Sequence, residues 1–422
     1  MTREEALARD AADPLAAHRQ AFLLPEGVIY LDGNSLGALP RATPARVREV
    51  VEREWGEGLI RSWNDAHWID YPRRVGAKIA RLIGAQADEV LCADSTSVNL
   101  FKTLAAALHL MRGLPRASTP SRRVILSERS NFPTDLYIAQ GLGRLLDDAY
   151  ELKRVAFDEV ADAIDPTVAI MLLTQVNYRT GALHDLPALT ARAHAAGALT
   201  IWDLSHSAGA LPVDLGSAGA DFAVGCGYKY LNGGPGAPAF VYVAQRHLAT
   251  LADDRYAQPL SGWLGHRAPF EFDPDYVPSP SIDRFAVGTP SILALAALDS
   301  GVDTVLAAGP AALRAKSVAL TEAFIARVEA ECGDAVALAS PRSAAARGSQ
   351  VCFSHPQAHA VMQALIERGV IGDFRAPDIL RFGFAPLYVR HIDVVDAAAA
   401  LADVLRTEAW RAARFQQGRY VT

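Results

Sequence analysis

Cysteine is scarce in this chain, and its spacing argues against two kinds of small, cross-linked fold. The 422 residues contain four cysteines, far apart in sequence, at Cys92, Cys226, Cys332 and Cys352. None forms a Cys-x-x-Cys pair, so neither a disulfide framework nor a structural zinc site is expected. The histidines show no His-Glu-x-x-His spacing, and the pair His355 and His359 has no third ligand nearby. The sequence therefore predicts no metal site.

Long apolar runs and an excess of positive charge are also absent. No run reaches the roughly 18 apolar residues of a membrane-spanning helix, and residues 1–6 lack the basic-then-apolar pattern of a signal peptide. The formal net charge is −6 and the basic residues are scattered, so there is no electrostatic reason to expect nucleic acid. These features predict a cytoplasmic protein with no membrane or nucleic-acid partner.

What the chain does have is an alternation of apolar strands and helices. Residues 168–173 and 198–203 are nearly continuous apolar strands, and 186–196 between them has helical spacing. Such strands are typical of a parallel sheet that is covered by helices on both faces. Beyond residue 350 shorter strands and helices follow one another. We therefore predict an α/β fold, with a large, mostly parallel sheet sandwiched by helices and a smaller C-terminal α+β domain.

A single lysine stands at the centre of a glycine-rich stretch, residues 225–236, between the apolar runs 220–224 and 239–243. Burial between two strands lowers the pKa of a lysine and frees its amine as a nucleophile. Lys229 is therefore a candidate for a Schiff base with an aldehyde cofactor. Considered alone, the stretch is more typical of a surface hairpin with a solvated lysine, since short motifs often match by chance.

An aspartate at the end of the preceding strand strengthens the cofactor hypothesis. Asp203 ends the strand 198–203, and His206 lies in the loop that follows. Ligands of open α/β sheets bind just beyond the carboxyl ends of the strands. A carboxylate there can keep a pyridinium nitrogen protonated, as a cofactor of the pyridoxal phosphate type requires. The alternative is that Asp203 only caps a turn.

Two predicted helix starts could complete such a site. Residues 94–97 place an aspartate and three hydroxyl residues before a helix that runs to about residue 111, which suits a phosphate. At residues 131–135, Phe132 could stack on a flat ring and Asp135 could reach its edge. Ordinary helix capping explains both segments as well.

Three further segments have open interpretations. Arg381 lies among apolar neighbours, and its anionic partner is either an internal carboxylate or a substrate carboxylate. The aromatic segment 60–68 suits a pocket wall or an oligomer contact. The irregular segment 258–290 is long enough to suggest a functional loop.

Five segments together carry a resemblance to a known family. They are Tyr30-Leu31-Asp32-Gly33-Asn34-Ser35-Leu36-Gly37, Asn131-Phe132-Pro133-Thr134-Asp135, Trp202-Asp203-Leu204-Ser205-His206-Ser207-Ala208-Gly209, Gly227-Tyr228-Lys229-Tyr230-Leu231-Asn232 and Arg381-Phe382-Gly383-Phe384-Ala385-Pro386-Leu387-Tyr388. In these segments and in their order the chain resembles the kynureninases, which are pyridoxal-phosphate enzymes of fold type I, the aspartate-aminotransferase fold. The first and last segments are the most specific to that family.

The resemblance implies a role for each matching residue. Lys229 would form the Schiff base and move the Cα proton, Asp203 would pair with the pyridinium, and Tyr228 would bind phosphate and donate a proton. Further cofactor contacts are implied for Thr96, Ser97, Phe132, Pro133, Thr134, Asp135, Thr174, His206, Trp263 and Thr289. Substrate contacts are implied for Ser35, Trp63 and Arg381, with Arg381 on the substrate α-carboxylate.

The resemblance also implies the reaction and the assembly. L-kynurenine would be hydrolysed to anthranilate and L-alanine, and 3-hydroxykynurenine to 3-hydroxyanthranilate and L-alanine, by way of a ketimine and cleavage of the Cβ–Cγ bond. This chemistry belongs to tryptophan catabolism, the kynurenine pathway and NAD biosynthesis. A homodimer with shared active sites would form, in which Trp263 and Thr289 reach the phosphate of the neighbouring subunit. Residues 1–60 would join the small domain, 61–308 would form the large cofactor domain, and 309–422 the small domain.

Three rival functions remain open. A cysteine desulfurase of the same fold needs a mobile nucleophilic cysteine late in the chain, and neither Cys332 nor Cys352 lies in a loop that suits this role. An aminotransferase shares the residue types, although residues 32–37 and 381–388 favour kynureninase. A non-enzymatic regulator would need a DNA-binding module, for which the acidic residues 1–27 are too few.

Overall fold

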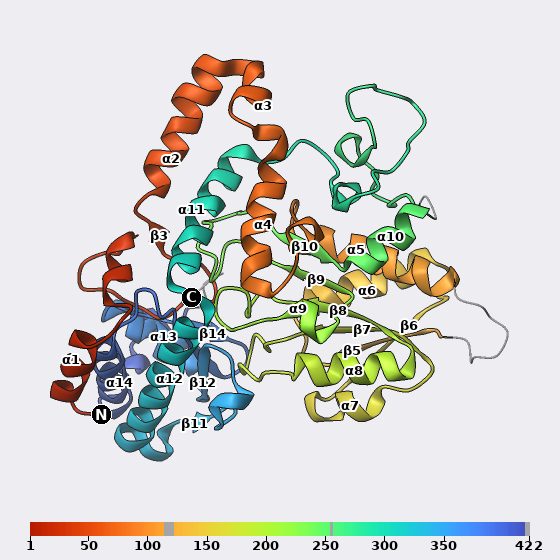
Figure 1. Ribbon diagram of the computed structural model, residues 1–422. Helices are drawn as coiled ribbons and strands as arrows, with labels where there is room; N and C mark the ends of the chain where they lie inside the picture. The colour runs from red at the N-terminus through yellow and green to blue at the C-terminus, as the bar shows by residue number, and fades with distance from the viewer. Residues whose placement is uncertain (114–121, 254–255, 418–422) are drawn as a thin grey trace.

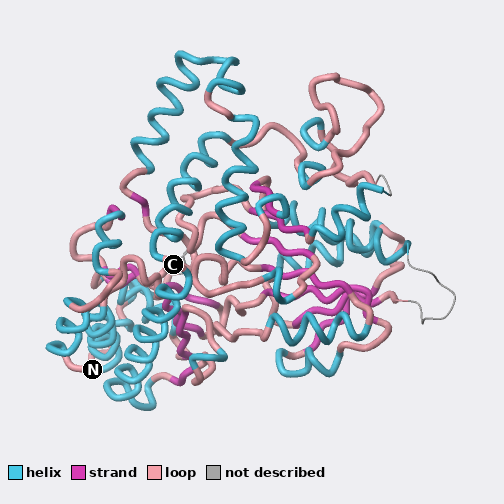
Figure 2. Tube along the Cα trace, viewed as in Figure 1, coloured by secondary structure: helices cyan, strands magenta, loops and turns pink. Residues whose placement is uncertain are grey.

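A seven-stranded sheet forms the centre of the molecule (Figures 1 and 2). The computed structural model describes residues 1–113, 122–253 and 256–417. The strand order is β4-β10-β9-β8-β7-β5-β6, and every neighbouring pair is parallel except those that involve β10. The strands are β4 Val90–Cys92, β5 Val124–Glu128, β6 Glu151–Val155, β7 Val168–Thr174, β8 Leu199–Asp203, β9 Phe222–Gly225 and β10 Phe240–Val243.

Helices cover both faces of this sheet, because its strands are apolar on both sides. Along β7, Ile170 and Leu172 pack on the side of α5, whereas Met171 and Leu173 belong to the core on the opposite face. Figure 1 shows α5, α6 and α10 on one side and α7 and α8 on the other. The helices are α4 Tyr71–Ile83, α5 Thr96–Gly113, α6 Pro133–Leu145, α7 Val160–Ala163, α8 Leu186–Ala196, α9 Leu215–Ala218, α10 Gln245–Asp253 and α11 Ile292–Ala308. The predicted α/β sandwich is confirmed.

A smaller antiparallel sheet lies beside the large one, with the order β11-β12-β15-β14. Helix α14 packs against α1, α12 and α13, so the two ends of the chain share one layer (Figure 1). Strand β2 also pairs in parallel with β13, which draws the first segment into this unit. The elements are α1 Arg3–Ala11, β1 Phe22–Leu23, β2 Ile29–Tyr30, β3 Leu39–Pro40, α12 Pro310–Cys332, β11 Ala337–Leu338, β12 Gln350–Ser354, α13 Ala358–Glu367, β13 Val370–Ile371, β14 Asp373–Arg375, β15 Ile379–Gly383 and α14 His391–Arg406.

The segment that follows β3 is not a single regular helix. Helix α2 covers Thr43–Glu49 and continues as a π-helix over Val50–Gly58 before the short helix α3, Ser62–Asp65. In Figure 1 this segment projects from the body of the molecule. The irregular segment 258–290 contains only short 3₁₀ turns within its length, among them Trp263–Gly265 and Ile282–Phe285.

Neither a membrane span nor a metal cluster stands out in the described part of the chain. No single helix there is long and apolar enough to cross a membrane; the bent pair formed by Ile292–Ala308 and Pro310–Ala335 passes only by length and composition. Within residues 1–113, 122–253 and 256–417, no group of three or more His, Cys, Asp or Glu side chains could hold a metal ion.

Candidate active site

The lysine loop connects β9 to β10 at the carboxyl edge of the parallel strands. The loop needs glycine where backbones approach closely: a Cβ at Gly227 would lie 2.4 Å from the Pro238 carbonyl oxygen. The loop also contacts the segment of residues 32–37: the Gly37 amide donates a hydrogen bond to the Tyr228 carbonyl oxygen at 2.8 Å. Lys229 is half-buried, and its Nζ lies 3.0 Å from Nε2 of His206.

A neutral histidine supports the lysine. Burial, and after it the positive charge of Lys229, holds the pKa of His206 well below its usual range. The imidazole therefore carries no charge, and its Nε2 lies within hydrogen-bond distance of Nζ of Lys229. His206 comes three residues after the end of β8, so the sheet edge itself places it beside the lysine.

Two carboxyl groups close the inner end of the site. Asp203 ends β8 with 3% of its surface exposed and accepts a hydrogen bond of 2.7 Å from the Ser205 amide. Asp135, in the first turn of α6, accepts from the Thr174 hydroxyl at 3.3 Å. Burial, and then the negative charge of Asp203, raises the pKa of Asp135 well above its usual range. The pair therefore holds one proton more readily than two separate carboxylates would.

The opposite end is a helix start. Ser95 caps α5 by accepting a 3.3 Å hydrogen bond from the Val98 amide, so the helix capping that was the alternative interpretation of this segment is present. Asp94 takes a positive φ of 50° and accepts from Nζ of the buried Lys102 at 2.7 Å, which fixes the turn. Thr96 and Ser97 then open an 18-residue helix, whose free N–H groups favour an anion.

These groups meet around one cavity of about 140 Å³. It is lined by Ser95, Thr96, Ser97, Phe132, Thr134, Asp135, Thr174, Tyr178, Asp203, Ser205, His206, Tyr228 and Lys229. Most of the cofactor residues predicted from sequence are therefore neighbours in space. Pro133 begins α6 directly after Phe132. Tyr178 was not predicted; its signal was its place in the loop after β7, at the edge that already supplied Thr174.

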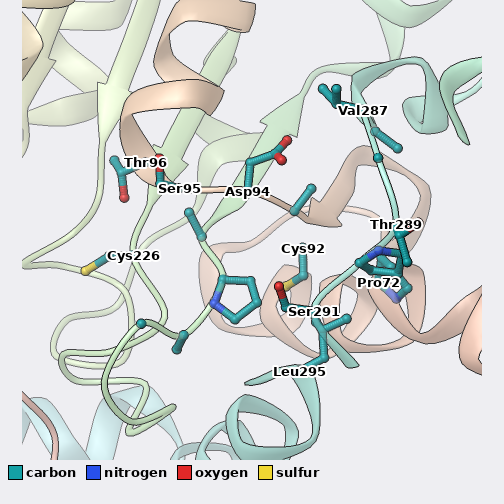
Figure 3. A pocket seen from close by; sticks show the side chains of 18 of the residues that line it. Pro72, Cys92, Asp94, Ser95, Thr96, Cys226, Val287, Thr289, Ser291 and Leu295 are labelled. Atoms are coloured by element: carbon teal, nitrogen blue, oxygen red, sulfur yellow. The ribbon is translucent and has the colours of Figure 1, made fainter. Parts of the chain in front are cut away.

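A second cavity, of about 460 Å³, adjoins the first at the start of α5 (Figure 3). The two share Ser95, Thr96 and Tyr228 in their walls. Thr289 lines the far side of the second cavity, and Figure 3 shows it across the opening from Thr96. Thr289 is thus near the helix start but does not line the cavity around Lys229.

Two predicted aromatic residues lie together but away from Lys229. The rings of Trp63 and Trp263 are 6.5 Å apart, and Trp68 lies 6.2 Å from Trp63. Trp263 lines an open groove with Phe272 and Tyr276. Among the described residues of this one chain, neither Trp63 nor Trp263 belongs to the walls of the two cavities above.

Arg381 is fully buried in β15, beside the loop of residues 32–37. Its Nε donates to Oδ1 of Asp373 at 2.7 Å, and its Nη2 donates to Oγ of Ser35 at 2.8 Å. Nη1 donates to the carbonyl oxygen of Tyr178, a cavity residue, at 2.6 Å. Of the two partners left open by the sequence, the internal carboxylate is present, and it is Asp373.

The side chains around the smaller cavity fit pyridoxal phosphate. Asp203 and Asp135 offer a carboxyl pair to a ring nitrogen, and Lys229 offers an amine to an aldehyde. Hydroxyls and free amides at the start of α5 suit a phosphate. Phe132 leaves its ring 41% exposed, with Nζ of Lys229 6.0 Å from the ring centroid. The donor set therefore matches each end of such a cofactor.

The chain is similar to known proteins of one family. The model of the "Kynureninase C-terminal domain" matches residues 313–401. The chain is 56% identical over 424 residues to the kynureninase of Burkholderia mallei (strain SAVP1), with 100% of both chains covered. It is 52% identical over 423 residues to the kynureninase of Pseudomonas fluorescens, again with 100% of both covered.

The fold also occurs in more distant proteins. The apo cysteine desulfurase from Thermococcus onnurineus NA1 is similar with a TM-score of 0.77 and 19% identity, over 93% of this chain and 98% of that one. At this identity the likeness concerns the fold alone. The identity of 56% over the full length is much higher, and because of it the chain belongs to the kynureninase family of pyridoxal-phosphate-dependent enzymes.

Proposed function

We propose that this protein hydrolyses L-kynurenine to anthranilate and L-alanine, and 3-hydroxykynurenine to 3-hydroxyanthranilate and L-alanine. The observation that carries the proposal is the 56% identity to a kynureninase over the whole of both chains. The cavity supports it, because Lys229 lies there between a carboxyl pair and a helix start. Roles in tryptophan catabolism, the kynurenine pathway and NAD biosynthesis follow from this activity.

Pyridoxal phosphate, when bound, supplies the electron sink that stabilises negative charge on the substrate carbons. Lys229 would join it as a Schiff base, and Asp203 would hold its ring nitrogen protonated, with Asp135 at the same edge. Further contacts are proposed for Thr96, Ser97, Phe132, Pro133, Thr134, Thr174, His206 and Tyr228. These assignments follow from the positions of the side chains around one cavity.

Proton movement is assigned to Lys229 and Tyr228. Lys229 would take the proton from the substrate Cα, and neutral His206, 3.0 Å from its Nζ, would hold the amine in place. Burial above all raises the pKa of Tyr228. Its phenol therefore keeps a proton at neutral pH and can give it to the carbon that departs when Cβ–Cγ breaks.

Recognition of the substrate is assigned to Ser35, Trp63 and Arg381. Arg381 would bind the α-carboxylate with the donor that its internal contacts leave free. Trp63 would form part of the wall around the aryl ring. The rings of Trp63 and Trp263 lie together, and neither lines the cavity around Lys229 of the same chain, which supports roles at the site of a second subunit. We therefore propose a homodimer in which Trp263 and Thr289 complete the neighbouring site.

The remaining parts of the proposal concern organisation and location. Residues 1–60 would move with the small C-terminal domain, 309–422, because β2 pairs with β13; residues 61–308 would form the large domain. A cytoplasmic location without membrane or nucleic-acid partners follows from the charge of −6 and the scattered basic residues.

A cysteine desulfurase activity is the weaker alternative. Cys352 is buried in β12, and Cys332 ends the long helix α12. Burial raises the pKa of Cys332 to about 11 and that of Cys352 to about 12. Neither thiol is ionised at neutral pH, so neither is a ready nucleophile.

The test uses the purified holoenzyme with L-kynurenine, and measures substrate, anthranilate and alanine together. Equal amounts of anthranilate and alanine are expected. Lys229→Ala should lose more than about a thousandfold in turnover, because both the Schiff base and the proton carrier are removed. Lys153→Ala, at an exposed lysine, is the control. A transaminated product instead of anthranilate would leave the fold intact and refute the reaction.

A further inference from the structure

Two guanidinium groups share one buried carboxylate, and one of them also contacts Tyr178, a residue of the active-site cavity. Asp373, on β14, is paired in register with Arg381 on β15, and both side chains are about 1% exposed. Arg375, two residues further along β14, donates from Nη2 to Oδ2 of Asp373 at 2.7 Å. Ser35 joins the group by donating to the same oxygen at 2.8 Å. Only Arg381 and Ser35 have a place in the proposed function.

We propose that Asp373 is a positioning residue that orients Arg381 toward the substrate carboxylate, and that Arg375 is the second cation of this carboxylate site. The inference rests on the proposed function, since it concerns the recognition of an α-amino acid. Asp373 touches neither substrate nor cofactor in this scheme and acts through the two arginines.

The hydrogen bonds of Arg381 leave one end of the guanidinium available. A guanidinium has five N–H donors. Nε and Nη2 donate to the two oxygens of Asp373, Nη2 donates also to Ser35, and Nη1 donates once to the Tyr178 carbonyl. The donor that remains is on Nη1, at the end nearest Tyr178, which lines the cavity. Asp373 thus binds Nε and Nη2 of Arg381, and this orients Nη1 toward Tyr178 and the active-site cavity.

Arg375 is less constrained than Arg381. Its side chain is 37% exposed, and its Nε is buried with no hydrogen-bond partner. Its charge acts on two residues of the cavity wall: it lowers the pKa of His206, after the larger effects of burial, Lys229 and Arg381, and it opposes the rise at Tyr228. Both arginines are therefore electrostatically coupled to the cavity.

Two guanidinium groups of this cluster share one carboxylate, because Arg375 and Arg381 both donate to Asp373. Burial, followed by the charge of Asp373, raises the pKa of Asp32, the remaining carboxyl, so a negative charge on Asp32 is disfavoured. A substrate carboxylate would supply a second anion for the two arginines, whereas a purely structural pair would need no second arginine.

The experiment compares Asp373→Asn with wild type as holoenzymes. We expect KM for L-kynurenine to rise about tenfold or more, from the loss of a charged, two-point hydrogen bond, while kcat changes far less. The decarboxylated analogue of kynurenine, tested as a competitive inhibitor, should keep its inhibition constant, because it has no carboxylate to recognise. Arg375→Gln should raise KM by about threefold to tenfold, with the same unchanged inhibition constant.

Asp378→Asn is the matched control. Asp378 follows Arg375 in the same hairpin and also pairs with an arginine, Arg179, at 2.9 Å, but it is 41% exposed. Its KM should match wild type. Three results for Asp373→Asn would overturn the inference: an unchanged KM, equal rises in KM for the substrate and in the inhibition constant of the analogue, or loss of the cofactor. Each would show that Asp373 has only a structural role. A wild type that does not release anthranilate would instead refute the proposed function.

Discussion

Two buried aspartates on adjoining parts of the sheet have opposite surroundings. Asp203 ends β8 at the carboxyl edge and is 3% exposed; Asp221 precedes β9 at the other edge and is 1% exposed. Asp221 accepts hydrogen bonds from the amide and hydroxyl of Thr200 and is within 2.8 Å of ring nitrogens of His194 and His247. Asp203 accepts from the Ser205 amide and otherwise faces Asp135 and the cavity.

The difference separates a structural carboxylate from one that awaits a ligand. Burial alone would raise the pKa of Asp221, but hydrogen bonds from His194 and His247 outweigh it and lower the pKa below its usual range. Its charge is compensated within the protein. Asp203 instead lies beside another carboxyl, Asp135, and the two repel each other. A buried carboxylate beside a second carboxyl, at the edge where α/β proteins bind ligands, is typical of a functional site.

The largest expected effect is on the activity of Asp203→Asn. The amide keeps the shape of the side chain but cannot keep a ring nitrogen protonated, so kcat should fall by about a hundredfold to a thousandfold, the usual cost of one preorganised charge. The melting temperature of the cofactor-free protein should not fall, because repulsion with Asp135 is relieved. Steady-state assays and thermal unfolding measure the two quantities. A kcat equal to that of wild type would assign Asp203 to turn capping.

Asp221→Asn is the counterpart, and its effect should be on stability alone. With its amide nitrogen in place of Oδ2, the variant would face the amide and hydroxyl of Thr200, and these two buried donors would lose their acceptor. We expect the free energy of unfolding to fall by about 2–3 kcal/mol, measured with urea on the cofactor-free protein. The kcat of the folded holoenzyme should be unchanged. A variant with normal stability and poor turnover would remove the distinction between the two aspartates.

Local patterns were enough to predict most of the large sheet and the residues at its edge. The strand predicted at 198–203 is β8, and the one at 168–173 is β7, because central strands are apolar on both faces. Asp203 ends a strand, and His206 and Lys229 each follow a strand by a few residues. The topology of a parallel sheet then brings them to one edge, so order along the chain was sufficient.

Features that depend on register or on surroundings were not predicted. Strand β6 alternates charged residues, as in Glu151 and Lys153, because it is the edge strand and pairs with β5 alone. The Asp373–Arg381 pair depends on how β14 and β15 are aligned with each other, and this register cannot be derived from the short sequence of the two strands. The contact of Trp63 with Trp263 joins segments 200 residues apart.

Asp135→Asn should give the smallest effect, a shift of stability with pH. Burial and the charge of Asp203 raise the pKa of Asp135 in the folded protein. The folded state therefore binds this proton more tightly than the unfolded state, and wild-type stability falls as pH rises above the unfolded value of about 4. The variant lacks this loss. Its cofactor-free form should melt at a higher temperature than wild type at pH 7, with the gap closing toward pH 4.

Asp214→Asn provides a control of opposite sign. The backbone and side-chain hydrogen bonds of Ser217 lower the pKa of Asp214, which caps α9. Its contribution to stability is present above the unfolded pKa and is lost as pH falls, so this variant should melt below wild type at pH 7, again with convergence in acid. If both variants shifted in the same direction, repulsion between Asp135 and Asp203 would not be the cause. The contrast between Asp221 and Asp203 would then need another explanation.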